Sequence, residues 1–385
     1  MRKLKFILIL LLCIAILPKA KAQVSLIENI VVDGLTRSYR VYVPASYDGS
    51  SSVPLLLNLH GYGSNAFQQE FYGEFRNIAD TANFILVCPD GTFDIYGFQY
   101  WNCFVADNIG VDDVKFLSNL IDTISSDYNI NANRIYSTGM SNGGFMSYSL
   151  AGELSERIAA IASVTGDITY DRFPAIMPTH PIPVMEIHGT ADLTVPYDGT
   201  ESFIPIEDVV NYWVEFNNCN PTPEVIEVPD TNPGDGCTAT HFIYSGGTNN
   251  ADVEFFRING GGHTWPGTIF ILGVTNLDIN ASQEIWRFFS RYSLDVLTDI
   301  FTTEMHSIKI TISPNPVISN IIIASDGNAQ ISDVRIFDIS GKSIYTDQSE
   351  TTITKTITIE NFAAGIYTVM CKVNGKYQFQ KIIKQ

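Results

Sequence analysis

The sequence places a serine in the pattern that nucleophilic hydrolases use. Residues 139–143 read Gly-Met-Ser-Asn-Gly, a G-x-S-x-G pattern with Ser141 at its centre. The pattern alone is common, but here it follows a short strand predicted over residues 134–138 and opens a helix predicted over residues 141–154. A nucleophile elbow requires this order, because the sharp turn lifts the serine hydroxyl above the sheet. The competing interpretation is a serine that only caps a helix.

A serine hydroxyl needs a general base to accept its proton. His263 stands in the glycine-rich segment 260–267, just after a strand predicted over residues 253–258. The base of a serine hydrolase with this chain order follows the last strands of the sheet. We therefore predict His263 as the base. His188, at the end of a strand predicted over residues 183–187, is expected to be a packed or hydrogen-bonded structural histidine.

Two aspartates compete for the acid that holds the base. Asp192 follows the strand at residues 183–187, and Asp167 follows a strand predicted over residues 158–164. Both precede His263, as the order serine, acid, histidine demands. We favour Asp192, whose carboxylate would orient the imidazole and stabilise its charged form. In the competing interpretation Asp192 is only a turn residue.

The sequence also suggests an oxyanion hole and a substrate surface. Residues 60–63 read His-Gly-Tyr-Gly and close an apolar strand at residues 54–59. We assign one amide donor to Tyr62, with Gly61 as the alternative, and the second to Asn142. Loop aromatics near these motifs, Trp101 and Trp265 among them, are predicted to stack on a substrate ring or to pack at the rim of the site.

The elements that must position these residues form an α/β fold. Short apolar runs over residues 54–59 and 84–88 suit strands buried on both faces of a sheet. Residues 112–128, 206–216 and 282–292 carry helical periodicity. Strands that alternate with helices predict a mostly parallel sheet with helices on both faces. A β-hairpin around Gly34, over residues 31–43, is expected to open the fold.

The chain divides into segments of different character. Basic residues, an apolar run over residues 6–17 and small residues at 20 and 22 predict a signal peptide over residues 1–22, with no stable membrane span. A catalytic domain is expected over residues 23–295 and a linker over 296–305. Residues 306–385 lose helical periodicity and are predicted to form a small β-sandwich-like module with a hairpin at Asn374-Gly375.

Charge and cysteine content narrow the partners. The formal net charge of −18 repels phosphate backbones, which argues against nucleic acid. Export permits disulfides, and we pair Cys88 with Cys103 and Cys219 with Cys237 because each pair is close in sequence. No zinc-site spacing occurs, and we expect neither a metal nor a cofactor.

Seven short motifs occur along the chain in one order. They are HGYG at 60–63, CPDG at 88–91, WN at 101–102, VDDV at 111–114, GMSNG at 139–143, HGTAD at 188–192 and GHTWPG at 262–267. Over about residues 25 to 292 the chain resembles the polyhydroxybutyrate-depolymerase-like esterases, which overlap the feruloyl and acetylxylan esterases. The resemblance implies an α/β-hydrolase fold with Ser141, Asp192 and His263 as the triad. It also implies an ester substrate, either an acyl group on plant-wall polysaccharide or a short polyester.

The tail carries its own set of motifs. They are ISPNP at 312–316, VRIFD at 334–338, SGK at 340–342 and AGIY at 364–367. The tail resembles a type IX secretion sorting domain, which implies the type IX machinery as a partner and a secreted product. Two other functions stay open: a peptidase or thioesterase with the same machinery, and an inactive surface binding protein.

Overall fold

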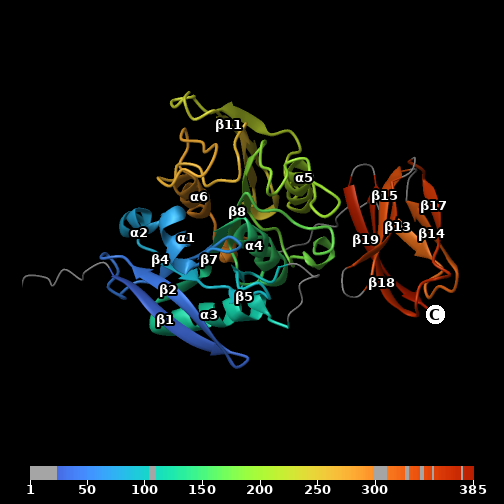
Figure 1. The fold of residues 1–385 in the computed structure, drawn as a ribbon, viewed down its shortest axis with the longest axis horizontal. Helices are drawn as coiled ribbons and strands as arrows, with labels where there is room; N and C mark the ends of the chain where they lie inside the picture. Colours follow the sequence, from blue (N-terminus) through green and yellow to red (C-terminus); the bar gives the residue numbers. More distant parts are fainter. Residues whose placement is uncertain are drawn as a thin grey trace, which may run out of the picture.

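A ten-stranded sheet forms the larger part of the protein in the computed structural model (Figure 1). The structure describes residues 24–103, 110–297, 310–325, 329–338, 342–348, 351–373 and 376–385. The predicted signal peptide and nearly all of the predicted linker lie outside these residues. The strand order is β1-β2-β4-β3-β7-β8-β9-β12-β11-β10.

Six neighbouring strands of this sheet run parallel, as buried apolar runs predict. They are β3 (Val53–Leu59), β4 (Ile85–Pro89), β7 (Ile130–Met140), β8 (Ala160–Val164), β9 (Val184–Gly189) and β12 (Val253–Asn259). Antiparallel strands flank them: β1 (Val24–Val32) and β2 (Leu35–Val43) on one edge, β11 (Thr238–Tyr244) and β10 (Glu224–Glu227) on the other. The predicted mostly parallel sheet is confirmed.

Helices cover both faces of the sheet. Successive strand residues point to opposite faces, so the buried apolar runs make both faces apolar, and each face must be covered. Leu57 shares a core with α3 (Asp113–Asp127), α4 (Asn142–Glu153) and α5 (Ile206–Phe216). Leu56 shares the core of the other face with α1 (Ala66–Tyr72), α2 (Arg76–Ala82) and α6 (Ala281–Phe289). A short hairpin of β5 (Thr92–Phe93) and β6 (Gln99–Tyr100) follows β4, and α7 (Leu294–Leu297) follows α6.

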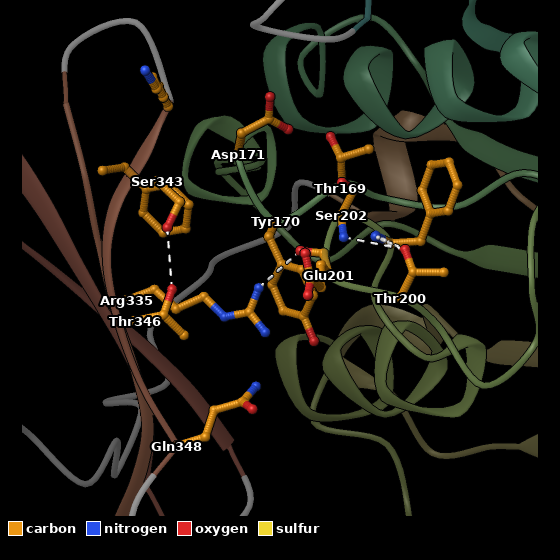
Figure 2. A pocket seen from close by; sticks show the side chains of 13 residues that line it. Thr169, Tyr170, Asp171, Thr200, Glu201, Ser202, Arg335, Ser343, Thr346 and Gln348 are labelled. Atoms are coloured by element: carbon orange, nitrogen blue, oxygen red, sulfur yellow. Dashed lines mark hydrogen bonds between the residues drawn. The ribbon is translucent and has the colours of Figure 1, made fainter.

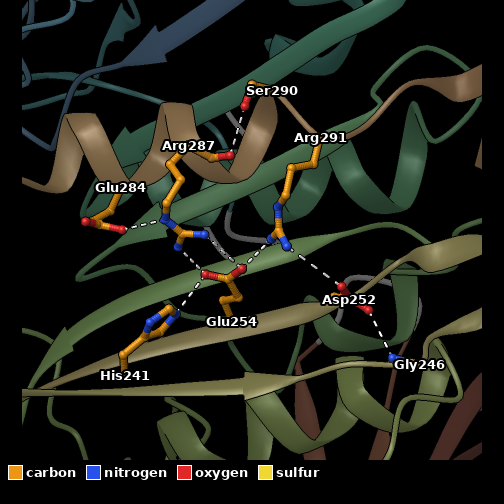
Figure 3. A network of polar contacts seen from close by, with 8 residues as sticks. All are labelled: His241, Gly246, Asp252, Glu254, Glu284, Arg287, Ser290 and Arg291. Carbon is orange, nitrogen blue, oxygen red and sulfur yellow. Dashed lines mark hydrogen bonds and ion pairs between the residues drawn. The ribbon is translucent and has the colours of Figure 1, made fainter. Parts of the chain in front are cut away.

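An ion network around the buried Glu254 fixes α6 against the sheet (Figure 3). The Glu254 carboxylate on β12 pairs with Arg287 and Arg291 and lies 2.8 Å from Nε2 of His241 on β11. Burial alone would raise the pKa of Glu254. The hydrogen bonds from His241 and Arg287, with the charges of both arginines, outweigh burial and lower the pKa to about 2. The network therefore holds β12, the strand before His263, between β11 and α6.

The tail forms two small sheets around its own core. One sheet joins β13 (Ile310–Ser313), β14 (Asn320–Ser325) and β17 (Thr354–Thr358). The other joins β16 (Ser343–Asp347), β15 (Ile331–Phe337), β18 (Gly365–Val373) and β19 (Lys376–Lys384). Apolar side chains of both sheets pack together. The predicted all-β tail is confirmed, while its predicted turn at 374–375 lies outside the described residues.

The tail docks on the flank of the catalytic domain (Figures 1 and 2). The Arg335 guanidinium lies 3.6 Å from the centre of the Tyr170 ring and donates a 3.2 Å hydrogen bond to the carbonyl of Glu201. Lys372 pairs with Asp208 at 2.7 Å. The tail therefore meets the catalytic domain through oriented polar contacts, around a pocket of about 810 Å³ that both parts line. Aromatic contacts of Phe173 with Tyr377 and Phe379 add to this interface.

The predicted disulfides are wrong, because neither bridge is present. Cys88 belongs to the core on one face of the sheet and Cys103 to the core on the other. The same holds for Cys237 and Cys219. The sheet separates each pair, although its members are close in sequence. The Cys103 sulfur instead lies 3.1 Å from the side-chain nitrogen of Asn142.

Candidate active site

Ser141 occupies a strained turn between β7 and α4. Its backbone angles are φ 52° and ψ −119°, a region that non-glycine residues rarely adopt. The turn is tight enough to bring α4 against β3, since a Cβ on Gly143 would lie 2.2 Å from the carbonyl oxygen of Leu59. Only glycine fits there. The Ser141 amide donates to the carbonyl of Val164 on β8 at 2.8 Å, which fixes the turn over the sheet.

Asp192 and His263 meet above neighbouring strands. Asp192 follows β9 and His263 follows β12, and the two strands are paired. Asp192 Oδ2 lies 2.7 Å from His263 Nδ1, while Oδ1 accepts the amides of Thr194 and Val195 at 2.8 and 2.9 Å. Burial alone would raise the pKa of Asp192, but the hydrogen bond and charge of His263 outweigh it and lower that pKa.

The rival acid, Asp167, does not take this place. Its buried carboxyl accepts the amide of Ile168 at 2.6 Å, and burial raises its pKa well above the usual value. An unionised carboxyl could not stabilise an imidazolium. The structure thus brings Asp192, rather than Asp167, to His263.

Ser141 and His263 line one pocket of about 760 Å³. Part of its wall was not predicted from the sequence: Phe71, Tyr72, Met140, Phe270 and Leu272. The apolar run Ile-Phe-Ile-Leu at residues 269–272 was a usable signal, because it lies between two glycines and outside every predicted strand and helix. In the structure its members are half to largely exposed in a loop. The aromatic wall makes the pocket suited to an apolar acyl or aryl group.

The His60 imidazole fixes the peptide at the predicted oxyanion hole. His60 Nε2 accepts the Gly91 amide at 2.9 Å, so the proton sits on Nδ1, which donates to the Gly61 carbonyl at 2.7 Å. Burial lowers the pKa of His60, which keeps the ring neutral. In a trans peptide the Tyr62 N–H points opposite to the Gly61 carbonyl, and therefore away from His60. A Cβ on Gly61 would lie 3.5 Å from that of Ser141, so this backbone passes beside the serine.

The two tryptophans predicted to contact substrate are buried instead. Trp101 donates from Nε1 to the His60 carbonyl at 2.9 Å, and Trp265 donates to the Ser282 hydroxyl at 3.2 Å. Their exposed fractions are 0% and 1%. Each indole N–H donates to a buried acceptor, so each ring packs in a core rather than at the rim of the pocket. The exposed aromatics at the pocket are Tyr62, Phe67 and Phe270.

The Asn142 side chain clamps the start of α4. Its Oδ1 accepts the Trp101 amide at 2.6 Å, and its Nδ2 donates to the Trp101 carbonyl at 3.1 Å. Asn142 is the first residue of the helix, where backbone N–H groups have no intrahelical acceptor. The clamp therefore sets the direction in which the first amides of α4 point, beside Ser141.

Comparison with known proteins finds esterases over the larger part of the chain and a sorting domain over the tail. Residues 48–219 match the phospholipase/carboxylesterase family, and residues 311–385 match the secretion system C-terminal sorting domain. A bifunctional acetylxylan esterase/xylanase of Neocallimastix patriciarum is 28% identical over 263 residues, which are 68% of this chain and 34% of that protein. Feruloyl esterase D of Neurospora crassa is 27% identical over 278 residues, covering 68% of this chain and 84% of the relative.

The chain spans less than half the length of some of the relatives it matches. Feruloyl esterase B of Piromyces equi is 29% identical over 242 residues, and the match spans 59% of this chain and 42% of that protein. Among solved structures, an acetyl xylan esterase from Aspergillus awamori superposes with a TM-score of 0.51 at 13% identity, over 69% of this chain and 98% of that one. At that identity the likeness supports the fold alone. Within the described residues, no cluster of His, Cys, Asp and Glu has the makings of a metal site, and no helix is long and apolar enough to cross a membrane.

Proposed function

We propose that this chain, a carboxylic ester hydrolase with a C-terminal type IX sorting domain, cleaves its ester with Ser141 as nucleophile, His263 as base and Asp192 as acid. The observation that carries the proposal is the 2.7 Å contact between Asp192 Oδ2 and His263 Nδ1, made at the same pocket that Ser141 lines from its strained turn. A helix-capping serine needs no such partners.

The geometry supports a defined proton path. With Nδ1 donating to Asp192, the neutral His263 ring has its lone pair on Nε2 and can accept the Ser141 proton. The serine oxygen attacks the ester carbonyl and forms a tetrahedral oxyanion. His263 then returns the proton to the leaving alcohol, and an acyl-enzyme remains. Water activated by the same histidine releases the acid.

Backbone amides of Tyr62 and Asn142 are the proposed donors to the oxyanion, with Gly61 as the alternative to Tyr62. The His60 contact orients the first peptide, and the Trp101 clamp orients the second. Because these amides are fixed before substrate arrives, each donor should contribute about 3 to 4 kcal/mol to the transition state.

For the substrate we propose acyl esters on plant-wall polysaccharide, feruloyl or acetyl, or short polyhydroxyalkanoate esters. The names of the relatives support the first class, and the aromatic pocket wall accommodates an aryl acid. The sorting domain points to secretion, which would bring the enzyme to such polymers. Removal of residues 1–22 as a signal peptide is part of the same proposal.

Product identification tests both parts of the proposal. Purified enzyme is incubated with feruloylated arabinoxylan, acetylxylan and polyhydroxybutyrate, and the released acids are identified by chromatography. Ser141→Ala serves as the matched control. Release of ferulate, acetate or hydroxybutyrate by the wild type but not the variant supports the proposal. Equal release by both proteins would remove Ser141 as nucleophile, and release of none would contradict the substrate classes.

A further inference from the structure

A second histidine, fully buried, lies directly behind Asp192. His188 and Glu186 both sit on β9 and are at most 1% exposed. His188 Nδ1 lies 3.0 Å from Glu186 Oε1, and its Nε2 lies 2.9 Å from the Val195 carbonyl. The same Nε2 lies 3.6 Å from Asp192 Oδ2, the oxygen that receives the His263 hydrogen bond. One carboxylate oxygen thus stands between two imidazoles.

The hydrogen bonds indicate where the protons are. A carbonyl oxygen can only accept, so His188 Nε2 carries a hydrogen that it donates to Val195. Nδ1 faces Glu186, whose other oxygen accepts the Tyr148 hydroxyl from α4 at 2.7 Å. Burial raises the pKa of Glu186, and the hydrogen bonds from His188 and Tyr148 act against burial because they favour the ionised carboxylate. Burial alone would lower the pKa of His188, but the hydrogen bond and charge of Glu186 outweigh it and raise that pKa.

Other elements packed around His188 add little charge. Asp167, after β8, is buried, and burial raises its pKa well above the usual value and so favours its uncharged form. The Tyr197 ring lies with its centroid 6.3 Å from that of His188, in a T-shaped arrangement. Arg257 is the register partner of His188 on β12, but its guanidinium lies 3.8 Å from Glu207. The charges that face His188 are therefore those of Glu186 and Asp192, with His263 beyond Asp192.

We propose that His188 is a positioning residue, held as an imidazolium between Glu186 and Asp192, which anchors the Asp192 loop and weakens the hold of Asp192 on protonated His263. The inference rests on the proposed triad. The anchor is the bond to Val195, whose own amide donates to Asp192. The electrostatic part follows from position, because His188 Nε2 lies 3.6 Å from Asp192 Oδ2, the oxygen that receives the His263 hydrogen bond.

The expected size follows from Coulomb's law. Both imidazole nitrogens contact the same oxygen, so they are no more than about 6 Å apart. Two like charges at that distance repel by an amount equal to about 0.5 pH unit in water and about 2 units at a protein surface. The opposite charge of Glu186 cancels part of this. Loss of the His188 charge should therefore favour protonated His263 by about 0.3 to 1 pH unit.

The test is the pH profile of kcat/KM for 4-nitrophenyl acetate in Glu186→Gln. The amide can still bond Nδ1 and accept from Tyr148, so the shape of the site is kept while His188 becomes neutral. The acid limb should then move to higher pH by about 0.3 to 1 unit. Asp167→Asn, a matched change at a buried and uncharged acid, should leave the limb in place. A limb at the wild-type position in Glu186→Gln would overturn the proposal, and so would a downward shift.

A second measurement uses only the wild-type protein, so it tests the proposal even if Glu186→Gln does not fold. Nitrogen chemical shifts of the wild-type histidines distinguish an imidazolium from a neutral ring. His188 should show two protonated nitrogens at pH 7.5, and a neutral ring would overturn the proposal. Ser141→Ala and His263→Ala separate the two levels of the argument. If either variant keeps wild-type activity, the proposed triad fails, whereas an unmoved limb with both variants inactive refutes only the role of His188.

Discussion

Replacing Asp192 with asparagine should disable the base rather than merely weaken it. Asp192 Oδ1 accepts two amides, from Thr194 and Val195, so the amide oxygen of the variant must take that side. Its NH2 group then faces His263 Nδ1 in place of an acceptor. The imidazole must accept at Nδ1 and carry its proton on Nε2, the nitrogen that should receive the Ser141 proton.

The expected loss is about 10⁴-fold in kcat, the size found when the same aspartate-to-asparagine change gives the wrong histidine tautomer in a Ser-His-Asp triad. This loss equals about 5.5 kcal/mol in the activation free energy. The assay is steady-state hydrolysis of 4-nitrophenyl acetate, with thermal unfolding to confirm the fold. Asp167→Asn is the matched control and should change kcat little, because its carboxyl contacts the Ile168 amide and not His263. A value of kcat within tenfold of wild type in Asp192→Asn would refute the reasoning, as would a larger loss in the control.

Four further outcomes are expected. Ser141→Ala should fold normally and lose about 10⁴-fold or more in kcat; a covalent phosphonate label on the variant would argue against this nucleophile. The rate should fall on acidification with a single-proton dependence, since general-base catalysis needs one unprotonated imidazole and the lowered pKa of Asp192 keeps that acid ionised; two-proton dependence would contradict this. Glu254 has a folded-state pKa of about 2 against an ordinary 4.5. Its ionised form should therefore stabilise the fold by about 3 kcal/mol above pH 4.5, and this stability should be lost as the pH falls to about 2. In urea unfolding at pH 7 and pH 3, the stability of Glu254→Gln should depend less on pH than that of the wild type. Truncation after Leu297 should leave a soluble, active esterase that stays in the periplasm of the native host; secretion of the truncated protein, measured by cell fractionation, would show that the tail does not sort it.

The sequence predicted what depends on local pattern. The two-residue turn at Asp33 and Gly34 has positive φ at both positions, 50° and 81°, and the pattern around Gly34 indicated it. Buried runs indicated the parallel strands, and the elbow pattern indicated the strand–turn–helix at Ser141. The first strand nevertheless begins at Val24, seven residues before the predicted start, because an exposed edge strand needs little apolar alternation.

Long-range geometry was beyond the sequence. The cysteine pairing failed because closeness along the chain says nothing about which face of a sheet a residue joins, as Cys88 and Cys103 show. The tryptophans failed for a related reason: Trp265 lies in a loop but folds inward to reach Ser282. The pocket wall combines Phe71 of α1 with Phe270, about 200 positions later. No local pattern links them.

Positions in the turn around Ser141 and positions in the pocket wall differ in how well they tolerate amino-acid substitution. A Cβ at Gly139 would meet the Gly143 backbone at 2.5 Å, and one at Gly143 would meet Leu59 at 2.2 Å. These positions admit one amino acid for reasons of space, whatever ester is cleaved. The segment 268–277, by contrast, holds Ile269 at 84% exposure and Leu272 at 65%. Selection for a new acyl group can therefore change segment 268–277 while Gly139 and Gly143 stay the same. Sequence diversity among descendants of this enzyme should accumulate in that segment.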